Sequence, residues 1–122
     1  MKKLIAIGLV LLSTSAWAEW VELARNKLGT VYYIDPATKK TIGRPRVWTF
    51  VVYGNIKSNG TLSYRALHEA DCQNEMSRDL SSIYYTDLGT IVNSIADQPD
   101  PWGYPPPGSP HMSLFNYLCA PP

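Results

Sequence analysis

Residues 68–79, HEADCQNEMSRD, hold the residue types that could form a reaction centre. The segment carries His68, Cys72 and four acids, so both a cysteine nucleophile and a metal site must be considered. A catalytic thiol has to be free and needs a base beside it. On a β-strand, His68 and Cys72 would share one face but stand about 13 Å apart, too far for one proton transfer or one metal ion. On a helix they would be close, so the local conformation decides the question.

The pattern of residues 63–72 favours a strand. Even-numbered positions from 64 to 72 hold Tyr, Ala, His, Ala and Cys, whereas Arg65, Glu69 and Asp71 fall on the odd positions with Leu67. This is a period of two with the charges on one face. A helix is the rival interpretation, because Ala, Leu and Glu favour helices. The preceding Asn59-Gly60 suits a type I′ hairpin turn, which favours the strand.

The N-terminus is typical of a bacterial secretory leader. Lys2 and Lys3 precede the apolar residues 4–12, and Ala-Trp-Ala at 16–18 forms a cleavage site before Glu19. We therefore predict a signal peptide at 1–18, export through the inner membrane, and a mature domain at 19–122. A buried N-terminal helix is the alternative. The apolar run is too short to span a bilayer, and no second run of spanning length follows, so no transmembrane segment is expected after cleavage.

The composition of the mature chain limits its function. Loss of Lys2 and Lys3 reduces the basic residues from 11 to 9, against 10 acids. A nearly neutral chain argues against nucleic-acid binding, which needs a basic face. About 100 residues suit one small domain with a modest core.

The two cysteines, Cys72 and Cys119, both lie in the mature chain. An even count in an exported protein predicts a disulfide, with a free thiol pair as the alternative. Such a bond would join the end of a strand to the C-terminal segment, and it would remove Cys72 as a nucleophile. With only His111 left to help His68, a metal site lacks ligands, so neither a metal nor another cofactor is expected.

Strand-like and helix-like patterns divide the remaining chain. Residues 97–110 hold six of the ten prolines and should form an extended connector, with a polyproline ligand as the alternative. Ser109 and Pro110 are typical of a helix start, and Met112, Phe115 and Leu118 share a face with Cys119. Strands are expected near residues 20–24, 30–34, 47–53, 63–72, 75–85 and 89–95.

A few surface residues could bind a partner. Lys39, Lys40, Arg44 and Arg46 form a small basic patch, either a solvated loop or a contact with an anionic partner. Trp102, within the proline connector, either packs against the sheet or contacts a ligand. No serine–histidine–acid spacing, phosphate loop or nucleotide-binding motif is present, so no enzymatic activity is expected.

The order of several short motifs resembles the surface-adhesin protein E family of Gram-negative bacteria. The resemblance covers nearly the whole mature chain and depends on order and spacing rather than on any single motif. It is carried by Trp20, Val31-Tyr32-Tyr33-Ile34-Asp35-Pro36, Val47-Trp48, Glu69-Ala70-Asp71-Cys72, Arg78, Leu80, Tyr84-Tyr85, Pro101-Trp102, Pro107-Gly108-Ser109 and Cys119.

The resemblance implies an α+β fold, with an antiparallel sheet of about six strands and one C-terminal helix tied by a disulfide. It also implies an adhesin that binds host matrix or serum proteins, including vitronectin and laminin, and that forms a homodimer. The family's namesake is lipid-anchored, whereas no lipid-acceptor cysteine follows the leader here. A fold carries over to a relative more safely than an activity does.

Three functional hypotheses follow. The first is an exported non-enzymatic binding protein, an adhesin, in the periplasm or on the outer cell surface. The second is a soluble periplasmic inhibitor or an accessory protein of envelope assembly. The third, an enzyme that uses His68 or His111, has the least support from the sequence.

Overall fold

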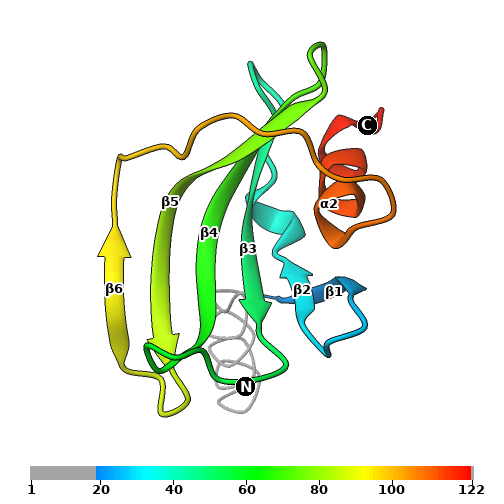
Figure 1. The fold of residues 1–122 in the computed structure, drawn as a ribbon. Helices are drawn as coiled ribbons and strands as arrows, with labels where there is room; N and C mark the ends of the chain where they lie inside the picture. Colours follow the sequence, from blue (N-terminus) through cyan, green and yellow to red (C-terminus); the bar gives the residue numbers. More distant parts are fainter. Residues whose placement is uncertain (1–18, 122) are drawn as a thin grey trace, which may run out of the picture.

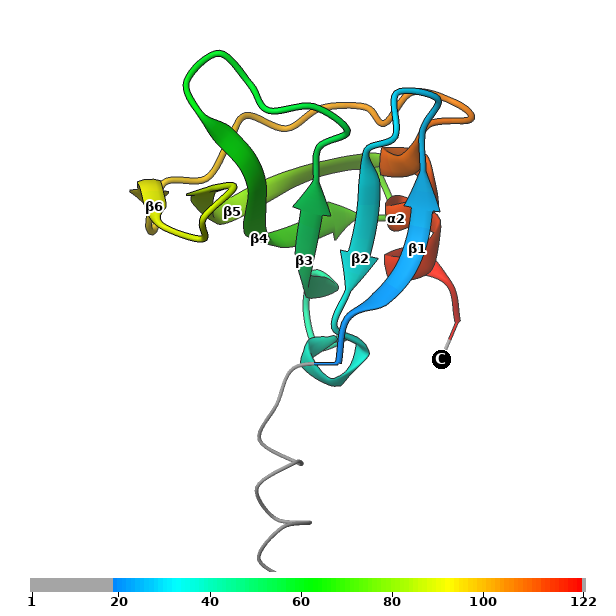
Figure 2. The ribbon, with the colours of Figure 1, turned by 90° about the horizontal axis from the view of Figure 1, so that it is seen from below.

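One antiparallel sheet of six strands forms the body of the domain. The computed structural model describes residues 19–121, so the expected signal peptide lies outside the described residues. The strands lie side by side in chain order, and the sheet twists so strongly that β5 runs across the direction of β1 (Figures 1 and 2). The strands are β1 (Val21–Arg25), β2 (Val31–Ile34), β3 (Arg46–Val52), β4 (Thr61–Asp71), β5 (Met76–Thr86) and β6 (Ile91–Ile95). The predicted α+β fold with about six strands is therefore confirmed.

Strand β3 shows why one face of this sheet is buried. Its burial alternates along RVWTFVV, with Val47, Thr49 and Val51 buried and the residues between them partly exposed. Successive side chains on a strand point to opposite faces, so this pattern directs one face toward the core. The register of β3 against β4 pairs Val47 with His68, which places His68 on that same face.

Helix α2 (Pro110–Cys119) covers part of the buried face (Figure 1). It starts as predicted, because the Ser109 hydroxyl accepts a hydrogen bond from the Met112 amide at 3.2 Å and Pro110 occupies the first turn. Its inner side chains complete a core formed by Ile34, Val47, Ala70, Leu114, Phe115 and Leu118. A helix of ten residues is marginal alone in water, so its position depends on this packing and on covalent attachment.

A disulfide attaches the helix to the sheet. Cys72 follows β4 directly, Cys119 is the last residue of α2, and the two are bonded with their Cα atoms 5.6 Å apart. The predicted pairing is confirmed. Lys39 adds a second contact, because its ammonium donates to the Tyr117 carbonyl at 2.9 Å and lies 4.3 Å from the Tyr117 ring centroid. The helix is thus held at its C-terminal end by a covalent bond and by a lysine.

The proline connector forms part of the sheet edge. Strand β6 pairs with β5 only over residues 82–85. Near the start of β5, Ser77 and Gly103 exchange two backbone hydrogen bonds of 2.9 and 3.0 Å, and the Asp100 amide donates to the Asp79 carbonyl at 2.9 Å. The predicted extended connector is confirmed, and it supplies backbone partners that β6 does not reach.

The connection between β3 and β4 differs from the predicted type I′ hairpin. It spans residues 53–60, and of the Asn59-Gly60 pair only Gly60 has a positive φ, of 86°. The Asn59 side chain instead accepts a hydrogen bond from the Thr61 amide at 3.0 Å. That side-chain bond stabilises a turn in which a single glycine adopts the left-handed conformation, so the type I′ prediction is wrong.

We predict that the Cys72→Ser/Cys119→Ser double variant unfolds at a much lower temperature than the native protein. The bond joins two residues that are 47 positions apart in the sequence, for which loop-closure entropy gives about 4 kcal/mol. For a domain of this size, that amount corresponds to a loss of more than about 10 °C in Tm, measurable by calorimetry. Reduction of the native protein with dithiothreitol should give the same loss. A change below about 2 °C in either sample would contradict a structural role for the bond.

Candidate binding site

The segment that first suggested catalysis is a strand followed by a bonded cysteine. Strand β4 contains His68, and Cys72 is bonded to Cys119, so it has no thiolate to act as a nucleophile. The prediction of a strand with a tethered cysteine is confirmed. No group of three or more His, Cys, Asp or Glu side chains within residues 19–121 is arranged to hold a metal ion.

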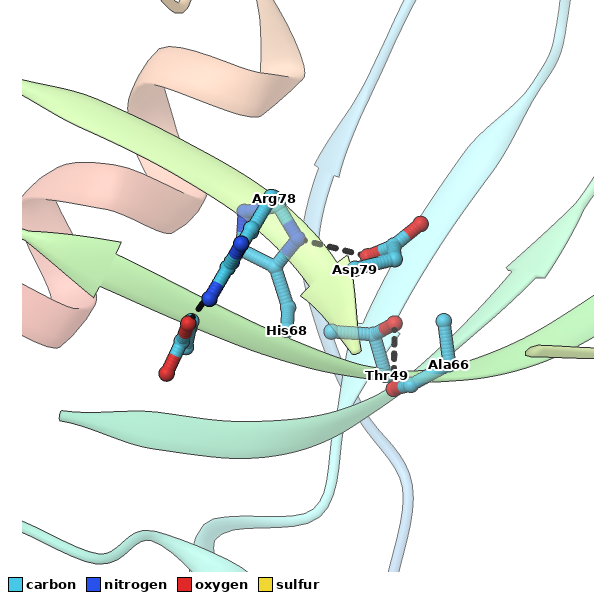
Figure 3. Close-up of polar contacts among 6 residues, drawn as sticks. Thr49, Ala66, His68, Arg78 and Asp79 are labelled. Atoms are coloured by element: carbon cyan, nitrogen blue, oxygen red, sulfur yellow. Dashed lines mark hydrogen bonds and ion pairs between the residues drawn. The ribbon is translucent and has the colours of Figure 1, made fainter. Parts of the chain in front are cut away.

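His68 has a different partner, which sequence reasoning missed. Its Nδ1 lies 2.7 Å from Oδ1 of Asp79 on β5 (Figure 3). Only 4% of His68 is exposed. The other ring nitrogen, Nε2, is buried and has no hydrogen-bond partner within the described part of the chain. A buried polar atom without a partner is costly, so this atom is a feature that needs explanation.

A β-bulge directs Asp79 toward His68. Leu67 pairs with Ser81, but the next residue, His68, pairs with Asp79, so Leu80 is an extra residue on β5. An extra residue shifts the alternation of faces by one position. Asp79 consequently points to the same face as His68, and neighbouring Arg78 points away from it (Figure 3).

His68 and Asp79 line a cavity of about 400 Å³ between β5, the proline connector and the start of α2. Asp100 of the connector and His111 of the helix also contribute to its wall. We call it the acid–histidine cavity after these four residues. The His68 and His111 rings lie 6.4 Å apart between centroids. The pKa of the Asp100 carboxyl is raised by burial and by the nearby negative charge of Asp79, whereas His68 acts in the opposite direction. The cavity thus gathers two carboxylates and two imidazoles.

His111 titrates differently from a free histidine. His111 is an exposed residue, but its ring packs edge-on against Tyr32 at a centroid distance of 5.3 Å. Loss of hydration lowers the pKa of the His111 imidazole; His68 lowers it further, while Asp79 raises it. At neutral pH His111 is therefore an uncharged member of the cavity.

The opposite face of the sheet carries a second group of residues. The Arg78 guanidinium lies 4.1 Å from the Trp102 ring centroid, and that of Arg44 lies 5.0 Å from it. We call Arg44, Arg78 and Trp102 the arginine–tryptophan cluster. The Nε atom of Arg78 also donates to Glu69 at 2.8 Å, and Glu69 is only 6% exposed. The cluster therefore has a rigid member, Arg78, and an exposed member, Arg44.

The structure brings together some of the predicted contact residues and separates others. Arg44 and Trp102 are in contact, and Lys40 is bridged to Arg46 by two backbone hydrogen bonds of 2.9 and 3.0 Å. Lys39 does not join them, because its ammonium is bound to Tyr117 of the helix. The sequence analysis named Arg78 only as part of the family resemblance and not as a contact residue, because its place beside Trp102 depends on the pairing of the connector with β5.

Comparison with known families matches nearly the whole described chain. The family model described as surface-adhesin protein E covers residues 20–120. The same comparisons found no match to a curated protein or to a solved structure. Within residues 19–121, no helix has both the length and the apolar character needed to cross a bilayer.

We predict that His111 titrates below the ordinary histidine value of 6.5. Because its pKa is lower in the folded state, folding favours the neutral ring. This contribution to the free energy of unfolding is fully present above about pH 6.5, and it is lost as the pH falls through the lowered pKa of the folded state. Histidine NMR titration should show the low pKa, and His68→Gln should shift it upward by removing the neighbouring ring.

A His111→Gln variant should lose less stability on acidification below pH 6.5 than the native protein; titration of His111 at or above 6.5 would contradict this.

Proposed function

The chain belongs to the surface-adhesin protein E family, and from this membership we propose that it is an exported, non-enzymatic binding protein that acts as an adhesin for host matrix or serum proteins. Vitronectin and laminin are the partners that the family resemblance suggests. The absence of a free thiol among the described residues supports a binding role over cysteine catalysis, because Cys72 and Cys119 are bonded to each other.

The observation that carries this proposal is the arginine–tryptophan cluster. Trp and Arg are the residue types that most often dominate the energy of protein interfaces. Here the indole is positioned by a connector hydrogen-bonded to β5, and Arg78 is fixed by Glu69. A partner therefore meets side chains that have already lost much of their conformational freedom, which lowers the entropic cost of binding. Nearby Lys40 and Arg46, both exposed, extend the positive charge at this end of the sheet.

A homodimer is also part of the proposal. Strand β6 is the last strand of the sheet, and its outer backbone groups face no further strand among the described residues. Ile91 is 64% exposed and Val92 37% exposed, and Leu88 just before the strand is 85% exposed. An apolar edge strand without charged residues is a surface on which a second strand can pair. β6 is therefore the edge at which we expect two copies to meet.

We predict that the mature domain, residues 19–122, binds immobilised vitronectin or laminin saturably, and that Trp102→Ala or Arg44→Ala weakens binding by about tenfold or more. Added salt should also weaken binding, since exposed charges are screened. Surface plasmon resonance measures both effects, and light scattering on the same sample gives the number of copies.

Arg25→Ala is the matched control, because it removes an exposed arginine that pairs with Glu22 on β1, at the other end of the sheet. Circular dichroism should confirm that all three variants keep the native fold. Two results would contradict the proposal: no binding at micromolar concentration, or an equal loss of binding in Arg25→Ala.

We further propose that residues 1–18 are removed on export and that the mature protein reaches the cell surface. The leader pattern and the family membership support this. Mass spectrometry of the native protein should give an N-terminus at Glu19, and protease added to intact cells should degrade it. Protection in intact cells, with degradation only after permeabilisation, would instead assign it to the periplasm and would favour an envelope inhibitor or accessory protein over an adhesin.

A further inference from the structure

The end of the sheet that lies away from the disulfide carries three exposed aliphatic side chains. Alternate connections of an antiparallel sheet fall at the same end, so the β1–β2, β3–β4 and β5–β6 connections lie along this end (Figure 1). Each holds one large aliphatic residue: Leu28 is 76% exposed, Ile56 54% and Leu88 85%. The pairing of Thr61 with Thr86 places the third connection next to the second. We call Leu28, Ile56 and Leu88 the aliphatic tips.

The turns themselves do not need these leucines. The same triplet, Leu-Gly-Thr, stands at 28–30 and at 88–90, and its glycine has a positive φ of 84° at Gly29 and 81° at Gly89. That conformation explains the glycine but not the residue before it, because turn positions favour short polar side chains. A single exposed leucine is ordinary on a protein surface. One aliphatic tip at each connection of the same end is a pattern that points to contact with something outside the fold.

Backbone contacts hold the first two connections in place. The side-chain oxygen of Asn26 accepts hydrogen bonds from the Leu28 amide at 2.9 Å and from the Thr30 amide at 3.1 Å. The Thr30 hydroxyl accepts one from the Gly54 amide at 3.3 Å. Gly54 also lies so close to the first turn that a side chain at this position would collide with the Leu28 carbonyl. The tips are therefore presented on turns that touch and brace one another.

Lysines accompany two of the tips. Lys27 directly precedes the first tip, and Lys57 directly follows the second; both are exposed. The Lys57 ammonium lies 4.4 Å from the ring centroid of Tyr53, at the start of the same connection. Within residues 19–121, neither lysine forms a salt bridge. The three connections hold these two lysines and one acid, Asp87, so this end of the sheet attracts an anionic surface.

Aliphatic tips beside lysines suit a lipid bilayer better than a protein surface. Leucine and isoleucine transfer favourably into the membrane, while a lysine keeps its ammonium at the level of the lipid phosphates. Protein interfaces depend on continuous packed patches, in which Trp, Tyr and Arg dominate the energy and leucine is under-represented. Here the polar residues Asn55, Ser58 and Asn59 separate the tips. Separate tips form a poor flat contact, but each can enter a bilayer by itself.

We propose that this end of the sheet docks on the surface of an anionic phospholipid bilayer. The aliphatic tips enter the boundary between head groups and acyl chains, and Lys27 and Lys57 contact lipid phosphates. Docking is weak and reversible, because only three side chains are inserted. Arg44 and Arg78 of the arginine–tryptophan cluster lie at the opposite end of the strands, in the β2–β3 connection and near the start of β5. A docked domain therefore directs the cluster away from the bilayer.

The test is co-sedimentation of the mature domain, residues 19–122, with phospholipid vesicles. One set of vesicles mixes phosphatidylglycerol with phosphatidylcholine, and the other contains phosphatidylcholine alone. We expect saturable binding to the anionic vesicles and much weaker binding to the neutral ones. Added salt should weaken the binding, because it screens the attraction between lysines and phosphates.

Variants test which side chains contact the lipid. Leu28→Ser and Leu88→Ser should each weaken binding by about tenfold, as expected for losing the burial of most of one leucine side chain. Lys27→Gln combined with Lys57→Gln should weaken it by about tenfold or more on anionic vesicles. Ile42→Ser is the matched control, because Ile42 is 92% exposed but lies in the β2–β3 connection at the opposite end. It should bind as the native protein does, and circular dichroism should show that every variant is folded.

Several results would overturn the proposal. They are an absence of binding to anionic vesicles, an equal loss in Ile42→Ser, or undiminished binding in folded Leu28→Ser and Leu88→Ser. A lower number of copies in Leu28→Ser without lipid, measured by light scattering, would instead assign the tips to a contact between two copies. Leu28 is the informative variant for that measurement, because its turn joins β1 and β2, at the other side of the sheet from the β6 edge.

Discussion

The unequal lengths of β5 and β6 are the constraint on which the rest of the structure depends. β5 has 11 residues and β6 only 5, so the backbone groups of residues 77–79 would face solvent without a partner. Residues 100–103 of the connector pair with them through three backbone hydrogen bonds. This pairing fixes a proline-rich segment that has little secondary structure of its own. It also sets the position of everything that follows, from Trp102 to the cap of the C-terminal helix.

The short helix α2 contributes to the wall of the cavity only because other interactions hold it in place. Helix propensity alone cannot maintain a helix of ten residues in water. Packing stabilises α2 instead, because Leu114, Phe115 and Leu118 on its inner face are buried. The Ser109 cap fixes its beginning, and the disulfide with the Lys39 contact fixes its end. His111 lies in the first turn, so the same restraints that stabilise the core also hold one wall of the cavity.

The sequence was sufficient to predict the elements and the disulfide because these depend on local or compositional signals. Alternation along β3 and β4, the Ser109-Pro110 cap and an even number of cysteines are all visible in the printed chain. The candidate sites were less predictable. Arg78 reaches Trp102 only through the pairing of Ser77 with Gly103, 26 residues farther along the chain. Asp79 reaches His68 only through the bulge at Leu80, and no local pattern specified that extra residue.

The bulge at Leu80 also explains how one short stretch of β5 serves two faces. Arg78 and Asp79 are adjacent in sequence, yet Arg78 pairs with Glu69 and contacts Trp102, whereas Asp79 holds His68 in the cavity. Charges of opposite sign are thereby separated by the thickness of the sheet, and each has its own partner. A buried ion pair alone contributes little net stability, because desolvation offsets the attraction between the charges. The His68–Asp79 pair also leaves Nε2 of His68 buried without a hydrogen-bond partner among the described residues, which further reduces what the pair contributes to stability.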